Sequence, residues 1–332
     1  MFKSKGELID ITQRIESEQM GVGTGFGKSI LFGEHFVVYG LPALAVGIDA
    51  QTIAEVTTNE SMGWTLDDQR PAMPGYKEKK LDEQKTSIEN VMKYCGIDSS
   101  NKGIHIKLEG DLVCASGIGA SAASCVALAR ALNEEFNLGL DDENINEAAY
   151  EGEKGYHGTP SGLDNTLSTY GGLVWYVRNL DGGASTFDRV SLKGSVHLVI
   201  ASTGLTASTI EVVGDVRSKK EKDPEWFEKI AKEYEILVKD GLDAFRALNL
   251  EKAGIMMDRN HQLLQQLTVS CKELDDLVKI AKDNGALGAK MTGTGRGGNM
   301  VALVSDEQSA NKISEALEKD GAAGVWITRF GL

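Results

Sequence analysis

The chain has 332 residues, of which 41% are hydrophobic and 25% are charged, a composition typical of globular proteins rather than disordered ones. Its formal net charge of -14 argues against a nucleic-acid partner, because phosphate backbones select for Lys and Arg. The length favours two domains over one core.

The four cysteines lie far apart and form no CxxC pair. We therefore expect reduced thiols rather than a zinc site or a disulfide scaffold. No apolar run reaches the roughly 18 residues that span a bilayer, and the first twenty residues lack the apolar core of a secretory signal. These features predict a cytoplasmic protein with no membrane partner, and they leave organellar import by another kind of signal open.

The first half of the chain predicts a mixture of strands and helices. In chain order we expect a charged amphipathic arm (1–20), strands joined by a turn (29–50), an irregular excursion (59–81), a half-buried strand (103–112), a buried helix from position 120 and a helix beginning near Asp141.

The second half opens with an apolar run that predicts the first strand of a second domain. The further elements expected are the strand itself (196–201), three amphipathic helices (226–248, 250–267 and 272–284), a strand (288–291), a glycine loop, a strand (300–304), a helix (306–320) and a strand (324–328). This final β-loop-β-α-β order suggests an α+β layer. We place the two domains at 1–193 and 194–332.

Two glycine-rich segments match nucleotide motifs poorly. Residues 21–29 (GVGTGFGKS) lack the first glycine of a P-loop, because position 22 is Val22, and β-like sequence follows where a P-loop opens a helix. Residues 293–298 match GxGxxG, but they lead into an apolar strand instead of a helix. A plain glycine hairpin remains the alternative for the second segment.

Residues 117–123 (GIGASAA) offer a better phosphate site, because they lie between an expected strand and an expected helix. Backbone N–H groups converge at a helix N-terminus, where the helix dipole favours an anion. Glycines let the main chain approach phosphates closely, and Ser121 adds a hydroxyl that suits Mg²⁺. A helix start with small residues for close packing remains equally open on these grounds.

Two carboxylates, Glu153 and Asp164, flank a turn that contains Pro160. One interpretation makes Ser161 the N-cap of the next helix and Asp164 a capping carboxylate. The other directs both carboxylates at one cavity, where one holds Mg²⁺ and the other accepts a hydroxyl proton. Lys28, flanked by apolar residues, would then keep Asp164 ionised.

Taken together, these segments resemble the GHMP kinases. Residues 27–40 (GKSILFGEHFVVYG) are similar to the first family motif, and residues 117–123 to the second, GLGSSAA. Residues 290–298 (KMTGTGRGG) are similar to the third, K-[LM]-TGAGGGG. The GEH triplet and residues 157–165 (HGTPSGLDN) resemble the mevalonate kinase branch in particular, because galactokinases and homoserine kinases lack the HGxPSGxDN pattern. The motifs follow family order across nearly the whole chain.

This resemblance implies a two-domain GHMP kinase fold: an N-terminal α/β domain plus a C-terminal ferredoxin-like α+β domain, with the active site between them. It implies transfer of the γ-phosphoryl of ATP to the 5-hydroxyl of (R)-mevalonate, an early step of isoprenoid and sterol biosynthesis. The cofactor implied is Mg²⁺. We expect a monomer or homodimer whose small-molecule partners are ATP and (R)-mevalonate.

The resemblance also implies roles for individual residues. Asp164 matches the catalytic base and Lys28 the lysine beside it, and both also belong to the substrate site. Ser121 and Glu153 match the Mg²⁺ ligands. The other matched substrate-binding residues are Glu34, His35 and Thr209. The matched phosphate-binding residues are Gly117, Ile118, Gly119, Ala120, Ser121 and Ala122.

Some positions depart from the family pattern. Phe26 replaces the proline of a PGK triplet, and Ala120 removes one hydroxyl, so only Ser121 is assigned to the metal. Ala207 stands where many relatives have an arginine, and Arg296 interrupts the third glycine run. We hypothesise that the Arg296 guanidinium turns toward the site and offsets the missing positive charge.

Two alternatives remain. The chain could be another GHMP kinase, such as a phosphomevalonate kinase or galactokinase, or a non-catalytic binding protein with the same fold. A degenerate relative should have lost at least one catalytic-type side chain, whereas this sequence has all four.

Overall fold

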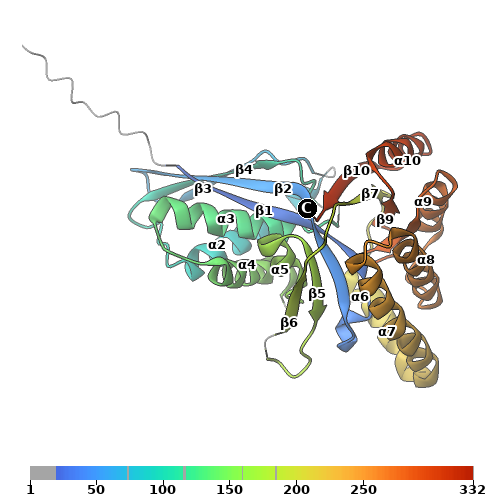
Figure 1. Cartoon of the computed structure of the whole chain (residues 1–332). Helices are drawn as coiled ribbons and strands as arrows, with labels where there is room; N and C mark the ends of the chain where they lie inside the picture. Colours follow the sequence, from blue (N-terminus) through green and yellow to red (C-terminus); the bar gives the residue numbers. More distant parts are fainter. Residues whose placement is uncertain (1–19, 73–74, 115–116, 159, 184, 332) are drawn as a thin grey trace, which may run out of the picture.

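The computed structural model describes residues 20–72, 75–114, 117–158, 160–183 and 185–331. The expected arm therefore lies outside the described residues except for Met20. Figure 1 shows two β-sheets, each with helices on one side, that meet near the middle of the molecule. Within the described residues no helix is long and apolar enough to cross a membrane.

The first sheet has six strands in the described part of the chain. They are β1 (Gly21–Phe32), β2 (Ala43–Asn59), β3 (Trp64–Asp68), β4 (Gly103–Gly110), β5 (Leu173–Val177) and β6 (Thr186–Val190). Strand β2 pairs antiparallel with β1 along one edge. Along its other edge the 17-residue strand is long enough to pair antiparallel with β5 near its start and with β4 near its end. Strand β3 extends the sheet in parallel beside β4, and β6 pairs with β5.

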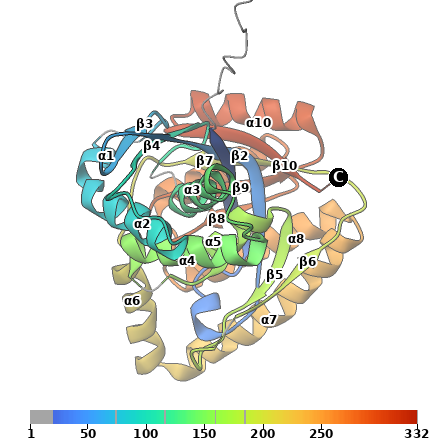
Figure 2. The ribbon, with the colours of Figure 1, turned by 90° about the vertical axis from the view of Figure 1, so that its left-hand side faces the viewer.

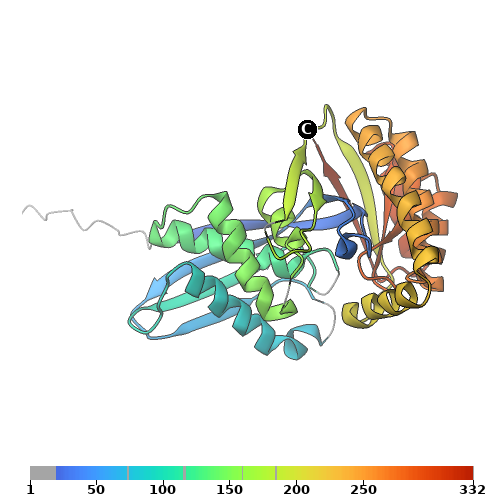
Figure 3. The same ribbon diagram turned by 90° about the horizontal axis from the view of Figure 1, so that it is seen from below.

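Helices cover one face of this sheet (Figure 3). They are α1 (Tyr76–Lys79), α2 (Leu81–Tyr94), α3 (Ala120–Phe136), α4 (Asp142–His157) and α5 (Leu163–Tyr170), and the short 3-10 helix η1 (Val37–Tyr39) follows β1. Figure 2 looks nearly along α3, which lies between the strands of the sheet and helices α4 and α5. The start of α3 is thereby held in the interior of the molecule.

The second sheet has the order β10-β7-β9-β8 and is antiparallel throughout. Its strands are β7 (Val196–Ser202), β8 (Gly288–Thr292), β9 (Asn299–Val304) and β10 (Gly324–Phe330). The accompanying helices are α6 (Thr209–Lys222), α7 (Pro224–Arg246), α8 (Leu250–Gln266), α9 (Lys272–Asp283) and α10 (Glu307–Lys319). Helices α8, α9 and α10 contact the sheet directly, and α7 packs on α8.

The two sheets are joined by a shared core. One hydrophobic cluster contains Leu31 and Phe32 of β1 together with Val199 of β7. The Phe36 and Tyr234 rings stack with their centroids 3.8 Å apart. The Tyr234 hydroxyl on α7 also donates to Pro42 O at 2.6 Å, at the start of β2. The elements that flank the candidate site are thus fixed relative to one another.

A stripe of glycines explains the first glycine-rich segment. A Cβ at Gly21 would lie 2.1 Å from Ala131 O, and one at Gly23 would lie 2.1 Å from Ala127 O. Successive glycines of β1 therefore meet successive turns of α3, and any larger side chain would push the helix away. The segment is not a P-loop, as expected, but part of a strand that begins at Gly21, eight residues before the expected start at residue 29.

Most of the expected elements are present within one to three residues of their predicted ends. The expectation of an irregular excursion over 59–81 is wrong in part, because β3 and the short helix α1 lie within it. Helix α5 begins after Gly162 rather than after Ser161, since Gly162 has a φ of 84° and is itself the N-cap. The expected domain boundary at 193/194 falls between β6 and β7 and stays a prediction.

Candidate active site

Lys28 and Asp164 form an ion pair at the centre of the site. Lys28 Nζ lies 3.1 Å from Asp164 Oδ1, and the two side chains are 9% and 31% exposed. Lys28 comes from β1, just beyond a register shift between Phe26 and Gly27, and irregularities of this kind re-aim side chains. Asp164 lies in the first turn of α5, where the helix dipole favours a negative charge. The partly exposed carboxylate is available to a ligand.

The glycine turn before α3 meets this pair directly. Lys28 N donates to Ile118 O at 2.8 Å. A Cβ at Gly119 would lie only 2.7 Å from Lys28 Cγ, and Gly119, the N-cap of α3, has a φ of 83°. Within the described part of the chain no side chain caps this helix start, so its first N–H groups lack an acceptor from a capping residue. This geometry suits the binding of a phosphate.

Arg70 is hydrogen-bonded to the start of α3, next to the same turn. Its guanidinium is buried, donates to Ala120 O at 3.2 Å and forms an ion pair with Asp68 at 2.7 Å. Hydrogen bonds and the charge of Arg70 outweigh the burial of Asp68 and lower its pKa to about 2. This pair was not predicted, because Asp68 ends the unexpected strand β3 and Arg70 follows two residues later.

Glu153 lies beside Ser121 in a nearly inaccessible position. The carboxylate is 1% exposed, and its Oε1 has no hydrogen-bond partner among the described residues. Burial, reinforced by the charge of Asp164, raises the pKa of Glu153 to about 8, although a hydrogen bond from Ser121 and the charge of Lys28 oppose the shift. A buried carboxylate with an unsatisfied oxygen is suited to a cation.

The chemistry of these groups fits Mg²⁺ held jointly with a nucleotide. Within the described residues no cluster of three or more His, Cys, Asp or Glu side chains could bind a metal alone. Mg²⁺ is typically bound by one or two carboxylates together with substrate phosphates. Glu153, Ser121 and the adjacent anion site at the start of α3 meet that requirement.

His35, Thr294 and Thr209 form a chain of hydrogen bonds that joins the turns after β1 and β8 to the start of α6. His35 Nε2 lies 2.7 Å from Thr294 O, and Thr294 Oγ1 lies 2.7 Å from Thr209 Oγ1. Burial lowers the pKa of His35, the hydrogen bond to Thr294 opposes the shift, and the charge of Arg296 adds to it. His35 and Thr209 are thereby brought together through Thr294, which the sequence interpretation did not single out.

Glu34 has a different setting from its neighbour. Its side chain has no exposed surface and forms an ion pair with Lys290, which is equally buried. Lys290 also donates to Met291 O at 2.7 Å. Our expectation that Glu34 contacts a substrate stays a prediction, but the described structure gives its carboxylate another partner. A lysine within the otherwise apolar strand β8 was the available sequence signal.

Arg296 is engaged with the protein itself. Its Nη1 lies 2.5 Å from Asp215 Oδ2 on α6, and its Nε donates to Thr268 O at 3.3 Å. The guanidinium is nevertheless near enough for its charge to act on His35. Our hypothesis that it offsets a missing positive charge stays a prediction.

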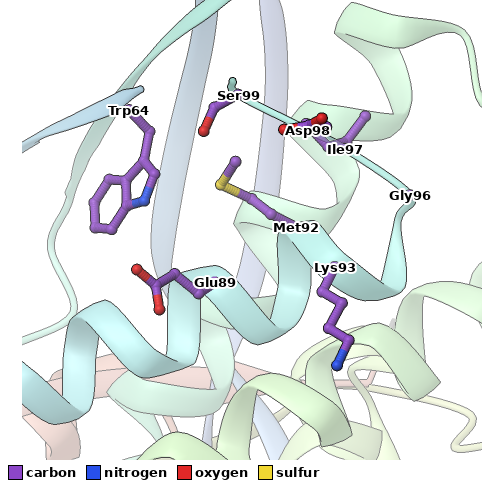
Figure 4. Close-up of a pocket in the computed structure, with 8 residues that line it drawn as sticks. All are labelled: Trp64, Glu89, Met92, Lys93, Gly96, Ile97, Asp98 and Ser99. Atoms are coloured by element: carbon purple, nitrogen blue, oxygen red, sulfur yellow. The ribbon is translucent and has the colours of Figure 1, made fainter. Parts of the chain in front are cut away.

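Two cavities lie away from the Lys28–Asp164 pair. One of about 420 Å³ lies at the end of α2, where Trp64 faces Met92 while Lys93 points away (Figure 4). Another of about 820 Å³ lies between α4 and the β5–β6 hairpin and reaches Asn165. Neither is lined by Lys28, Asp164 or Glu153.

Comparisons with known proteins agree with this geometry. Residues 84–172 match the family described as GHMP kinases N terminal domain, and residues 242–323 match GHMP kinases C terminal. The mevalonate kinase of Thermococcus sibiricus is 32% identical over 92% of this chain and 95% of its own length. That of Pyrococcus furiosus is 31% identical over 92% of this chain and 95% of its own.

Solved structures extend the likeness to three dimensions. The L. major mevalonate kinase, solved in complex with R-mevalonate, superposes with a TM-score of 0.91 at 41% identity and covers 95% of this chain and 98% of its own. The galactokinase of Lactococcus lactis shares the fold with a TM-score of 0.73 at 20% identity, covering 95% of this chain and 94% of its own. The expected two-domain GHMP kinase fold is confirmed.

Proposed function

Because the chain belongs to the mevalonate kinases of the GHMP kinase family, an ATP-dependent group, we propose that it transfers the γ-phosphoryl of ATP to the 5-hydroxyl of (R)-mevalonate. The product is 5-phosphomevalonate. The single observation that best supports this proposal is the Lys28–Asp164 ion pair, 3.1 Å long, beside the uncapped start of α3.

Asp164 acts as the general base. Its partly exposed carboxylate accepts the proton of the attacking hydroxyl while the hydroxyl oxygen bonds to the γ-phosphorus and the bond to the ADP oxygen breaks. Lys28 orients the Asp164 carboxylate through their ion pair and stabilises negative charge on the transferring group. The lack of a Cβ at Gly119 lets the glycine turn pack directly against Lys28, because a Cβ there would lie 2.7 Å from Lys28 Cγ.

The N–H groups of residues 117–122 receive the phosphates at the start of α3. Ser121 and Glu153 would hold Mg²⁺, which when bound neutralises charge on the β- and γ-phosphates. Burial and the charge of Asp164 raise the pKa of Glu153 to about 8. Metal binding would therefore displace a proton from this group.

The alcohol substrate is expected beside Asp164, between Lys28 and the chain of hydrogen bonds formed by His35, Thr294 and Thr209. The hydroxyls of Thr209 and Thr294 and the ring of His35 offer donors and acceptors to a small polyhydroxy acid. This arrangement suits a substrate with several oxygen atoms.

Replacing Asp164 with Asn tests the proposal. The amide is nearly isosteric but cannot accept the proton, so we expect kcat to fall by about 10²–10⁴-fold with little change in ATP binding. Asp82, which is exposed in the first turn of α2, provides the control: Asp82→Asn also alters a helix-start carboxylate, but turnover should be unchanged.

Retained turnover in Asp164→Asn would leave this residue as a helix-start carboxylate only. Phosphorylation of phosphomevalonate or galactose but not mevalonate by the unmodified chain would favour another GHMP kinase. ATP binding without turnover on any of the three alcohols would favour a non-catalytic binding protein.

A further inference from the structure

Two segments that are distant in the sequence are fastened together beside the substrate side of the site. One is the end of β1 with residues 33–35, and the other is the end of β8 with residues 293–294. Thr292 Oγ1 accepts a hydrogen bond from Ile30 N at 3.2 Å and donates one to Ile30 O at 3.0 Å. This contact joins the first sheet to the second, so each segment limits how the other can move.

The ion pair between Glu34 and Lys290 is the next contact along these segments. Both side chains have no exposed surface. Burial raises the pKa of Glu34 and lowers that of Lys290, and the charge of each opposes the shift of the other. A buried ion pair seldom stabilises a fold more than a well-packed apolar pair does. Stability alone is therefore a weak reason for placing these two charges here.

His35 follows immediately, in a backbone conformation that needs support. Its φ is 63°, in the left-handed region that disfavours residues with a Cβ. Such conformations persist where the surroundings over-determine them. Here the preceding residue is anchored to Lys290, and the His35 ring is anchored 2.7 Å from Thr294 O. Without the first anchor, His35 would be free to relax away from Thr294.

We propose that Lys290 is a positioning residue of the substrate site, whose buried ion pair with Glu34 holds His35 against Thr294 and thereby Thr294 against Thr209. The inference rests on the proposed function, because it assigns His35, Thr294 and Thr209 to the alcohol substrate. It gives Glu34 a structural task in the site in place of direct contact with the substrate.

The test is the double variant Glu34→Gln/Lys290→Met, which removes both charges and so leaves no unpaired ion in the interior. We expect the KM for (R)-mevalonate to rise by at least about tenfold while the KM for ATP stays within about twofold. A second readout is the NMR signal of the His35 imidazole, assigned with His35→Gln, which should shift in the double variant. An unchanged KM for mevalonate together with an unchanged His35 signal would overturn the inference.

Glu34→Asp decides the matter if the double variant does not fold. It keeps the charge but shortens the side chain, so the loop must move to reach Lys290, and the KM for mevalonate should again rise selectively. An unchanged KM in folded Glu34→Asp would count against the positioning role. If the unmodified chain does not phosphorylate mevalonate at all, the proposed function fails, and the His35 signal still tests the positioning contact.

A matched control is available at the other end of β8. Asp258 Oδ2 lies 2.6 Å from Lys282 Nζ, and Asp258 Oδ1 accepts a hydrogen bond from Ala289 N at 2.8 Å. This pair also anchors β8, and among the described residues neither side chain has a hydrogen bond or ion pair with a residue of the candidate site. Asp258→Asn/Lys282→Met should leave both KM values unchanged. If the KM for mevalonate rises as much in this control as in the Glu34→Gln/Lys290→Met variant, the rise is due to general loosening of β8 and not to the positioning of His35.

Discussion

Replacing Glu153 with Gln should change how stability depends on pH. In the folded chain without nucleotide or metal, burial raises the pKa of Glu153 from 4.5 to about 8. The folded state therefore keeps a proton that the unfolded state releases near pH 4.5. The stabilisation linked to this proton is fully present below pH 4.5 and is lost as the pH rises through about 8.

The size of the effect follows from the width of that interval. Each pH unit within it removes about 1.4 kcal/mol of unfolding free energy. Because the folded-state pKa lies at the upper end of this range, the slope falls as pH 8 is approached, and between pH 6 and pH 8 the chain should lose about 2 kcal/mol that Glu153→Gln, which cannot titrate, does not lose. Because Glu153 is only 1% exposed, screening by solvent should reduce this figure little.

Urea unfolding of both chains in EDTA, at pH 6 and at pH 8, measures this quantity. Other titrating groups are common to both chains, so the difference between the two pH dependences isolates Glu153. The variant should also be the more stable chain at pH 8 while losing catalytic activity. Parallel pH profiles for the two chains would mean that Glu153 is already ionised at pH 6 in the free protein, and our account of its environment would be wrong.

Other predictions concern the remaining parts of the site. Gly119→Ala should lower kcat by on the order of a hundredfold, because the added Cβ displaces Lys28. Gly139 is also at positive φ, but a Cβ there would have no atom within 4 Å, so Gly139→Ala should lower stability only. Equal kinetic effects in the two variants would contradict this. EDTA should abolish turnover and Mg²⁺ should restore it, whereas activity that survives full chelation would remove Ser121 and Glu153 from metal binding. In steady-state kinetics, Lys28→Met should lower kcat by a larger factor than it changes the KM for ATP. A selective rise in the KM for ATP would indicate that this lysine binds the nucleotide instead.

Much of the fold could be predicted from the periodicity of hydrophobic residues and from the positions of glycine and proline. The long helices of the second half and the strands around the glycine loop have strong amphipathic or apolar patterns, and they lie close to their expected positions. Strand β3 was missed because polar residues alternate along it at the edge of the sheet, which resembles a loop in sequence. The start of α5 was displaced by one residue because a glycine, instead of the serine before it, adopts the capping conformation.

The site was predictable to the extent that its residues fall in recognisable motifs. Lys28 and Asp164 are far apart in the sequence, and only the folded chain brings Lys28 Nζ within 3.1 Å of Asp164 Oδ1. Lys290 stood out as a charged residue in a buried strand, but nothing in the sequence paired it with Glu34. The partner of Arg296 was not predictable, because Asp215 does not differ locally from other charged residues. Pairing in three dimensions, which no sequence spacing encodes, decides what each charge does.

The central claim is that this chain phosphorylates mevalonate at the expense of ATP. The most direct measurement is coupled detection of ADP from the purified chain with ATP, Mg²⁺ and either (R)-mevalonate, phosphomevalonate or galactose. We expect ADP release that matches the mevalonate consumed, with only background release for the other two alcohols. Background release with mevalonate, or faster release with phosphomevalonate or galactose, would contradict it.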